Sequence, residues 1–252
     1  MDFTNKVIII TGASSGIGAG AAEYLSSLGA SLVLTGRNEN NLKEIAKKCK
    51  GSPLLIVGDV NVEAERFNII NKTIEKFGKL NFLVNNAGMG QGGDIKSTTM
   101  EQFDNVMTTN VRSVFHLTQL AIPYLVATQG NIVNVSSICG IRSIPGLLPY
   151  SMSKAALDQF TKCVALDMAP QNVRVNSINP AVINTEFFRR LGMSDDDYEA
   201  FLEKEKKIHA LGRVGTVVET AHAIAFLASD HATFITGTHL AVDGGKNIMS
   251  PN

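Results

Sequence analysis

A tyrosine and a lysine stand four positions apart in the stretch Tyr150-Ser-Met-Ser-Lys154. Residues four apart share one face of a helix, so the phenol and the ammonium would lie one turn from each other. A phenol with an ordinary pKa of about 10 exchanges protons poorly at neutral pH. The pair therefore supports catalysis only if other residues assist it, and otherwise it is an ordinary surface pair on an amphipathic helix.

A glycine-rich segment, Thr11-Gly-Ala-Ser-Ser-Gly-Ile-Gly18, lies between an apolar run and a helical pattern. A turn of this kind presents backbone N–H groups and the positive end of a helix to a pyrophosphate. The residues expected at the phosphates are Gly12, Ser14, Ser15, Gly16, Ile17 and Gly18. Glycines at this spacing also occur in tight turns without a ligand, and Gly-x-Ser-x-Gly matches a hydrolase nucleophile elbow. We favour phosphate binding because it explains the whole turn.

The second apolar run ends in Thr35-Gly36-Arg37. In a dinucleotide fold this position faces the adenosine ribose, where an acid favours a free 2′-hydroxyl and an arginine accommodates a 2′-phosphate. A guanidinium grips phosphate through two parallel hydrogen bonds. Arg37 thus favours NADP(H) over NAD(H), unless it is simply an exposed arginine.

Two further turns follow the third and fourth apolar runs. Asp59 and Val60 are expected at the adenine edge, and Asn85-Asn86-Ala87-Gly88 forms a small-residue turn. The carboxyl ends of parallel strands meet at one edge of a sheet, so both turns belong to the same predicted site.

Seven short apolar runs alternate with segments of helical spacing. The runs are Val7–Ile10, Leu32–Leu34, Leu54–Val57, Phe82–Val84, Ile132–Val135, Val173–Asn176 and His239–Val242. Continuous apolar runs are typical of strands covered on both faces, and the intervals are long enough for right-handed crossovers. We predict a single α/β domain over residues 1–252, a doubly wound (Rossmann) fold with a seven-stranded parallel sheet and helices on both faces.

The interval from about 184 to 215 breaks this rhythm, because it is polar and rich in charge. Its aromatic residues include Phe187, Phe188, Tyr198 and Phe201. We expect one or two short helices that cover the substrate as a lid. A solvated helical excursion on the surface is the alternative.

Composition excludes several function classes. The chain has 23 basic and 23 acidic side chains, so it lacks the field of one sign that attracts nucleic acid or an anionic membrane. The first residues lack a secretory pattern, no run of about 18 apolar residues occurs, and the three cysteines show no CxxC spacing. The five histidines form no ligand-like pairing, so no metal is expected. We expect a cytoplasmic protein with free thiols.

Taken together, these motifs resemble those of the short-chain dehydrogenase/reductase family, and they cover nearly the whole chain. The matching features are Thr11-Gly-x-x-x-Gly16-x-Gly18, Asn85-Asn86-Ala87-Gly88, Asn110, Ser137, Tyr150-x-x-x-Lys154, Pro180-x-x-x-x-Thr185 and the tail Val242-Asp-Gly-Gly245. The resemblance implies an enzyme that transfers a hydride between a nicotinamide and a carbonyl or alcohol.

The resemblance assigns four catalytic residues. Tyr150 would donate the proton in reduction and accept it in oxidation, and Lys154 would hold the nicotinamide ribose and lower the phenol pKa together with the oxidised nicotinamide. Ser137, thirteen residues before the tyrosine, would orient the carbonyl, whereas Ser136 is the less favoured serine. Asn110 would kink its helix and hold a water in a proton relay from Lys154.

The resemblance also places Pro180, Ile183 and Thr185 at the nicotinamide carboxamide. Two positions depart from the common pattern. Ala181 replaces a frequent glycine after Pro180, and Ser15 stands where many NADP users carry a basic residue. We expect the first departure to reshape the nicotinamide pocket slightly, and the second leaves the choice of cofactor chiefly to Arg37.

The leading hypothesis is an NADPH-dependent reductase of a lipophilic, steroid-like or isoprenoid ketone. The cleft residues expected by analogy are Met89, Gly90, Gln91, Ile138, Ile144, Leu147, Met193 and the aromatic residues of 187–201. A 3-oxoacyl-thioester reductase shares every motif, and a dinucleotide-sensing regulatory protein is the non-enzymatic alternative. Apolar stripes within 106–126 and 151–168 suggest a homo-oligomer. The resemblance favours a tetramer over a dimer, because in that family the carboxyl-terminal end commonly helps to build a tetramer.

Overall fold

The computed structural model describes residues 1–189 and 192–249 and contains one seven-stranded sheet. All neighbouring strands pair in parallel, in the order β3-β2-β1-β4-β5-β6-β7. The strands are β1 (Val7–Thr11), β2 (Ser31–Gly36), β3 (Leu54–Val57), β4 (Phe82–Asn85), β5 (Asn131–Val135), β6 (Arg174–Pro180) and β7 (His239–Val242). The predicted fold class and all seven predicted strands are confirmed.

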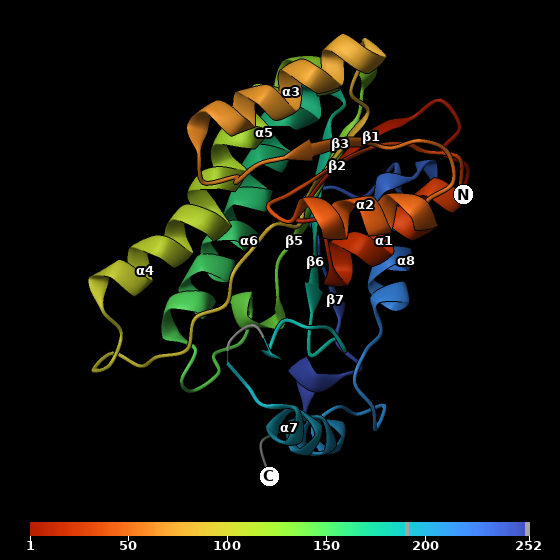
Figure 1. Ribbon diagram of the computed structural model, residues 1–252. Coiled ribbons are helices and arrows are strands. Elements are labelled where there is room, and N and C mark those ends of the chain that lie inside the picture. The colour runs from red at the N-terminus through yellow and green to blue at the C-terminus, as the bar shows by residue number, and fades with distance from the viewer. Residues whose placement is uncertain (190–191, 250–252) are drawn as a thin grey trace.

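Helices cover both faces of this sheet (Figure 1). The α-helices of the described residues are α1 (Gly16–Ser27), α2 (Glu39–Lys48), α3 (Glu63–Phe77), α4 (Met100–Met107), α5 (Ser113–Thr128), α6 (Leu148–Met168), α7 (Asp195–Lys207) and α8 (Val217–Ala228). Apolar residues of α1, α2 and α8 pack on one face, and those of α3, α5 and α6 pack on the other.

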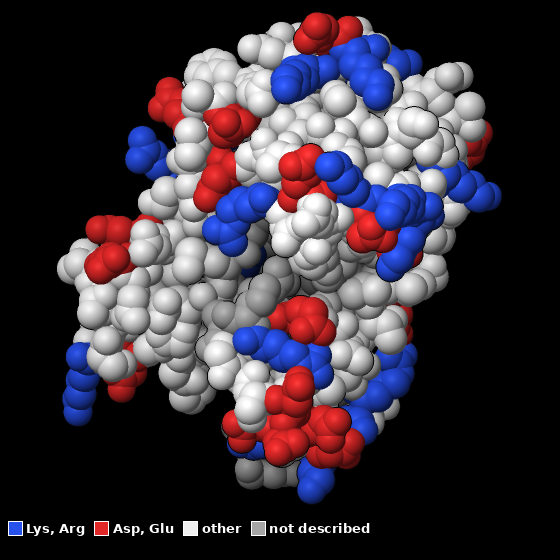
Figure 2. Space-filling model, viewed as in Figure 1, with Lys and Arg blue, Asp and Glu red and all other residues white. Residues whose placement is uncertain are grey.

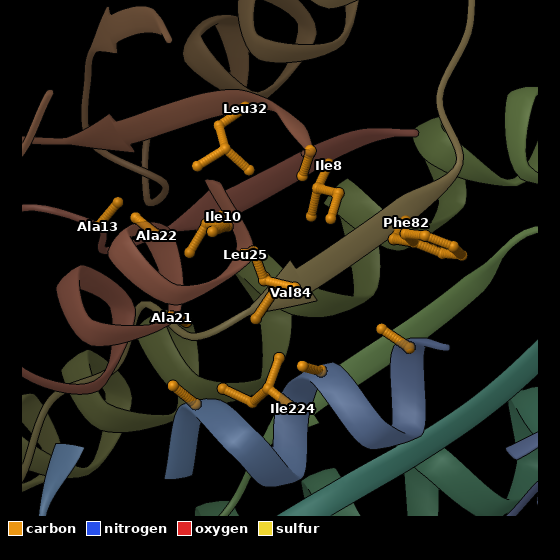
Figure 3. Packing of buried hydrophobic residues seen from close by; sticks show 14 of the residues in the cluster. Ile8, Ile10, Ala13, Ala21, Ala22, Leu25, Leu32, Phe82, Val84 and Ile224 are labelled. Atoms are coloured by element: carbon orange, nitrogen blue, oxygen red, sulfur yellow. The ribbon is translucent and has the colours of Figure 1, made fainter. Parts of the chain in front are cut away.

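Strand β1 shows how one apolar run serves two cores. Ile8 and Ile10 point to the face covered by α1 and α8, whereas Val7 and Ile9 point to the opposite face, as the two-residue period of a strand requires. Figure 3 shows Ile224 of α8 directed toward Val84 and the helix α1. Burial on both faces explains why the strand carries no polar alternation.

The strand order reverses between β1 and β4, so the loops after these strands diverge and leave a crevice. Chain segments after β1, β4, β5, β6 and β7 therefore gather at one edge of the sheet. Helix α7 lies beyond that edge (Figure 1).

The interval expected to form a lid contains helix α7. Ser194 caps it by accepting a hydrogen bond from the Asp197 amide at 3.2 Å, with acidic residues in its first turn and lysines in its last turn, as the helix dipole favours. A bridge between Ile183 and Gly215 closes the base of the excursion. Arg190 and Leu191, which belong to the predicted lid, lie outside the described residues.

Acidic and basic side chains are interspersed on the face shown in Figure 2, consistent with the balanced composition. Across residues 1–189 and 192–249, no helix is both long enough and apolar enough to span a bilayer.

Candidate functional site

A cleft of about 450 Å³ opens at the carboxyl edge of the sheet. Most of the predicted site residues line it. They are Gly12, Ser14, Ser15, Gly16, Ile17, Arg37, Asp59, Val60, Asn86, Ala87, Gly88, Ser137, Tyr150, Lys154, Pro180, Ile183 and Thr185. Gly18 and Asn110, which were also predicted, do not line the cleft. They lie directly against residues that do line it.

The glycine-rich turn is fitted to β4 and the residues after it. Gly12 adopts a left-handed backbone with φ of 64°, and a Cβ there would lie 2.9 Å from the Cα of Ala87. A Cβ on Gly18 would overlap the Asn86 amide and the Gly12 carbonyl. The Asn86 side chain in turn donates to the carbonyls of Thr11 and Gly12 at 2.8 and 3.1 Å. Gly18 therefore shapes the turn through packing.

This turn fits the pyrophosphate of a dinucleotide. Helix α1 begins at Gly16, so its amino end opens onto the cleft. Gly12 lines the same part of the cleft and places no side chain in it. Backbone N–H groups and the positive end of a helix bind phosphate in such a place. A Cβ on Gly16 would lie 3.5 Å from Thr185, which places the loop after β6 against the same turn.

At the adenosine end, the Arg37 side chain is 80 % exposed and lies 3.8 Å from the Asp59 carboxylate. An ion pair this open to water is weak, so the guanidinium can turn to a phosphate. A second hollow is lined by Ser14, Ser15, Arg37, Asn38, Glu39, Asn40, Asn41 and Glu186. The two glutamates were not anticipated there, and their carboxylates pair with Lys43 and Arg189.

Tyr150 and Ser137 meet in the middle of the cleft. Burial raises the pKa of the Tyr150 phenol, the Cys139 thiol adds to this rise, and a hydrogen bond with Ser137 opposes it. Lys154 by itself therefore does not produce the lowering of the phenol pKa that was predicted for it together with the oxidised nicotinamide. Dehydration destabilises the phenolate more than the neighbouring groups stabilise it. The Ser137 hydroxyl also accepts a hydrogen bond from the Cys139 amide at 3.1 Å.

Lys154 lies one helical turn after Tyr150 and is almost fully buried. Its Nζ donates to the Val135 carbonyl at 2.8 Å and lies 5.7 Å from the centroid of the Tyr150 ring. Burial lowers the pKa of Lys154 to about 8, and the Asp158 carboxylate partly opposes this shift. Near neutral pH the side chain still carries its positive charge.

Asn110 sits in a π-helical turn, Thr108–Arg112, which interrupts the α-helical pattern between α4 and α5 at the place where a kink was expected. Its amide accepts from the Met89 N–H and donates to the Met89 carbonyl, both at 2.9 Å. It also donates to Ser153 Oγ at 2.9 Å, and Ser153 donates to the Tyr150 carbonyl at 2.7 Å. Asn110 thus ties the loop after β4 to the Tyr150 helix, and its water relay stays a prediction.

Ser136 differs from Ser137 in what it contacts. Its hydroxyl donates to the Lys154 main-chain carbonyl at 3.3 Å and so braces helix α6. Asn179, on β6, donates to the Ser137 carbonyl and to Asp158, both at 2.9 Å. Ser136 therefore supports helix α6, whereas Ser137 contacts the phenol.

The substrate end is formed by Ile144, Leu147 and three phenylalanines of the 187–201 interval, Phe187, Phe188 and Phe201. Met89, Gly90, Gln91 and Ile138 also line the cleft as expected, whereas Met193 and Tyr198 do not.

Several cleft residues escaped sequence reasoning, among them Cys139, Glu205 and Lys246. Only the position of Cys139, two after Ser137, gave a signal in the sequence. Glu205 and Lys246 are distant in sequence and meet only through the fold. Within the described part of the chain, no cluster of His, Cys, Asp and Glu is arranged to hold a metal ion.

Comparison with known proteins places the chain among oxidoreductases. Residues 12–247 match a family model described as enoyl-(acyl carrier protein) reductase. The chain is 39 % identical to an uncharacterized oxidoreductase of Thermotoga maritima, with 99 % of this chain and all of that protein aligned. It is 35 % identical to the L-fucose dehydrogenase of Bos taurus, over 98 % of this chain and 91 % of that protein.

A solved structure with the same architecture contains a cofactor. It is the crystal structure of a short-chain dehydrogenase/reductase of unknown function from Caenorhabditis elegans, 34 % identical to this chain. The two superpose with a TM-score of 0.90, covering 98 % of this chain and 97 % of that one.

We expect Lys154→Met to remove a pH dependence of stability. Between about pH 8 and the ordinary lysine pKa of about 10.4, the unfolded chain holds a proton on Lys154 that the folded chain has lost. Unfolding free energy from this group therefore rises with pH across that window. Measured by urea denaturation, the native protein should gain about 1–3 kcal/mol relative to the variant between about pH 7 and pH 10. Parallel curves would contradict the lowered pKa.

Proposed function

This chain belongs to the short-chain dehydrogenase/reductase family, and we propose that it uses NADP(H) to interconvert a ketone and a secondary alcohol on a lipophilic substrate. Oxidoreductase activity on alcohol or carbonyl groups follows from the family. The observation that supports the finer proposal is the meeting of Ser137, Tyr150 and Lys154 in the wall of one cleft whose far end carries many apolar side chains.

The fitted turn at Gly12 and Gly16 would hold the pyrophosphate, and Lys154 would hold the nicotinamide ribose. When bound, the nicotinamide supplies or accepts the hydride. The chain's own residues orient the substrate and move the proton.

In reduction, the Tyr150 phenol donates its proton to the carbonyl oxygen. Burial raises its pKa, so the phenol stays protonated at neutral pH and is ready to donate. The Ser137 hydroxyl orients the same oxygen, and the Lys154 charge stabilises the phenolate that remains. In oxidation the proton moves the other way, from the alcohol to Tyr150.

A lipophilic substrate is supported by the residues at the end of the cleft. Aliphatic and aromatic surface is offered there by Ile144, Leu147, Phe187, Phe188 and Phe201. Contact with an apolar substrate removes this surface from water and so lowers the free energy of the complex. The alternative substrate, a 3-oxoacyl thioester, is supported by the acyl-carrier description of the matching family model.

We also propose a cytoplasmic location, since all three cysteines are free.

Tyr150→Phe should strongly reduce turnover while leaving the cofactor site intact. Removing the proton donor should lower kcat by about 10²–10⁴-fold in NADPH oxidation assays with a panel of ketones. NADPH affinity, measured by fluorescence titration, should stay within about twofold, because the phenylalanine keeps the ring. Full turnover by the variant would refute the mechanism, and absence of turnover by the native protein on any ketone or acyl thioester would favour a cofactor-sensing role.

The two neighbouring serines provide a matched control. Ser137→Ala should lower kcat/KM by about 10²-fold or more, because the substrate oxygen loses a hydrogen-bond donor. Ser136→Ala, which removes the brace to the Lys154 carbonyl, should have a much smaller effect. Equal losses would mean that the assignment of Ser137 is wrong.

Arg37→Ala should weaken NADPH binding about 10- to 100-fold, the effect of losing a hydrogen bond to a charged group, and leave NADH binding nearly unchanged. Arg37→Lys keeps the charge without the fork geometry and should fall between the two. Isothermal titration with both cofactors measures this. An equal loss for NADPH and NADH would contradict the preference for NADP(H).

We further propose a homotetramer formed in part by the outer face of α5 and α6. Phe115 on α5 is 53 % exposed and lies 6.0 Å, ring to ring, from Phe160 on α6, and Leu166 is 77 % exposed. Exposed apolar side chains gathered on one helical face are typical of subunit contacts. Phe115→Asp should reduce the mass measured by light scattering below that of four chains. Val62→Asp, at an exposed position beside α3, serves as the control and should not.

A further inference from the structure

Two oppositely charged side chains meet at the substrate end of the cleft. Glu205 lies near the end of α7, and Lys246 lies in a short 3-10 turn after β7 (Lys246–Ile248). They form an ion pair, both line the cleft, and they are only 6 % and 9 % exposed. The remaining charged residues of the lining are Arg37 and Asp59 at the adenosine end and Lys154 beside the phenol. The Glu205–Lys246 pair is thus the charged feature of the substrate end in the described part of the chain.

The pair sits on a well-braced backbone. His209 Nδ1 lies 2.7 Å from the Glu205 carbonyl oxygen, and the Arg142 guanidinium donates to the Lys246 carbonyl. The Lys246 amide donates to the Asp243 carbonyl at 3.0 Å. Side chains on a braced backbone can recognise a ligand with little loss of conformational entropy.

Closing α7 over the cleft does not by itself require charge. A buried ion pair must be dehydrated, and apolar residues of similar volume often stabilise a protein as well or better. The apolar alternative is already present next to it, in Phe187, Phe188 and Phe201. A charged pair in an otherwise apolar wall therefore calls for a ligand group that uses it.

The field of Lys246 reaches the catalytic segment. Burial raises the pKa of the Cys139 thiol, and the charges of Lys246 and Lys154 oppose that rise. Cys139 is itself bonded through its amide to the Ser137 hydroxyl. The pair and the reacting oxygen would therefore belong to one substrate-binding space.

We propose that the Glu205–Lys246 pair binds a neutral hydroxyl group of the substrate, which narrows the substrate to a hydroxylated ketone, or the corresponding diol, with an apolar body. A hydroxyl can donate to the Glu205 carboxylate and accept from the Lys246 ammonium at once. A carboxylate or phosphate on the substrate would meet the negative Glu205, and an ammonium would meet the positive Lys246. This inference rests on the proposed ketone–alcohol function of the same cleft.

Matched substrates test the proposal. Straight-chain methyl ketones of increasing length are compared with the same ketones bearing a terminal hydroxyl, and kcat/KM is measured with NADPH. At the chain length that spans the cleft, the hydroxy ketone should be preferred about 10- to 100-fold, the effect of a hydrogen bond to a charged group. Ketones with a terminal carboxylate or ammonium should show no such preference. Absence of a hydroxyl preference at every length would overturn the proposal.

Variants separate recognition from structure. In Glu205→Gln/Lys246→Met both charges are removed together, so neither is left unpaired, and the hydroxyl preference should fall to within about threefold of unity. The control Glu203→Gln/Lys206→Met removes an exposed pair from the same helix and should keep the preference. A variant that loses stability but keeps the preference would show that the pair only fastens α7 to the C-terminal segment.

A binding measurement distinguishes failure of this inference from failure of the proposed function. Calorimetric titration of each ketone into the Tyr150→Phe protein with NADPH reports affinity without turnover. Tighter binding of the hydroxy ketone, lost in the triple variant with Glu205→Gln and Lys246→Met, would support the pair even if no ketone were turned over. Equal affinities for hydroxy and parent ketones would refute the pair, even if ketone reduction were established.

Discussion

The hydrogen bond from Lys154 Nζ to the Val135 carbonyl fixes the reaction centre to the sheet. It joins the helix α6 to the carboxyl end of β5, a strand in the interior of the sheet, and so sets where Tyr150 can lie. The ammonium is held in a buried position, where its charge acts strongly on neighbours but dehydration lowers its pKa. Burial of this charge lowers the local stability of the fold, but it holds a positive charge beside the phenol.

A polar network behind this centre supports it from the protein side. Asp158 lies one turn after Lys154 and accepts a hydrogen bond from Asn179, which also holds the Ser137 carbonyl. His239 lies 3.8 Å from Asp158. Burial raises the pKa of Asp158 and lowers that of His239, so dehydration disfavours the charged form of each. The network links α6, β6 and β7 and keeps Ser137 and Lys154 in register.

The two ends of the cleft are built on different principles. The cofactor end is formed by backbone turns on the sheet, with little room for side chains at Gly12 and Gly18. The substrate end is formed by side chains of α7 and of the segments that follow β5, β6 and β7, which lie outside the sheet. Cofactor binding therefore depends on the common fold, whereas substrate choice depends on residues that can change without disturbing it.

The sequence by itself determined the seven strands, because runs such as Val7–Ile10 carry their own pattern of burial. It also placed the glycine turn, Ser137, Tyr150 and Lys154, since strand ends and a four-residue helical spacing bring them to one edge. Only the tertiary structure decided that Asn110 braces Met89 and Ser153, that burial raises the Tyr150 pKa, and that Glu205 meets Lys246. Contacts between distant segments and the removal of water are properties of the packed chain, and local sequence does not encode them.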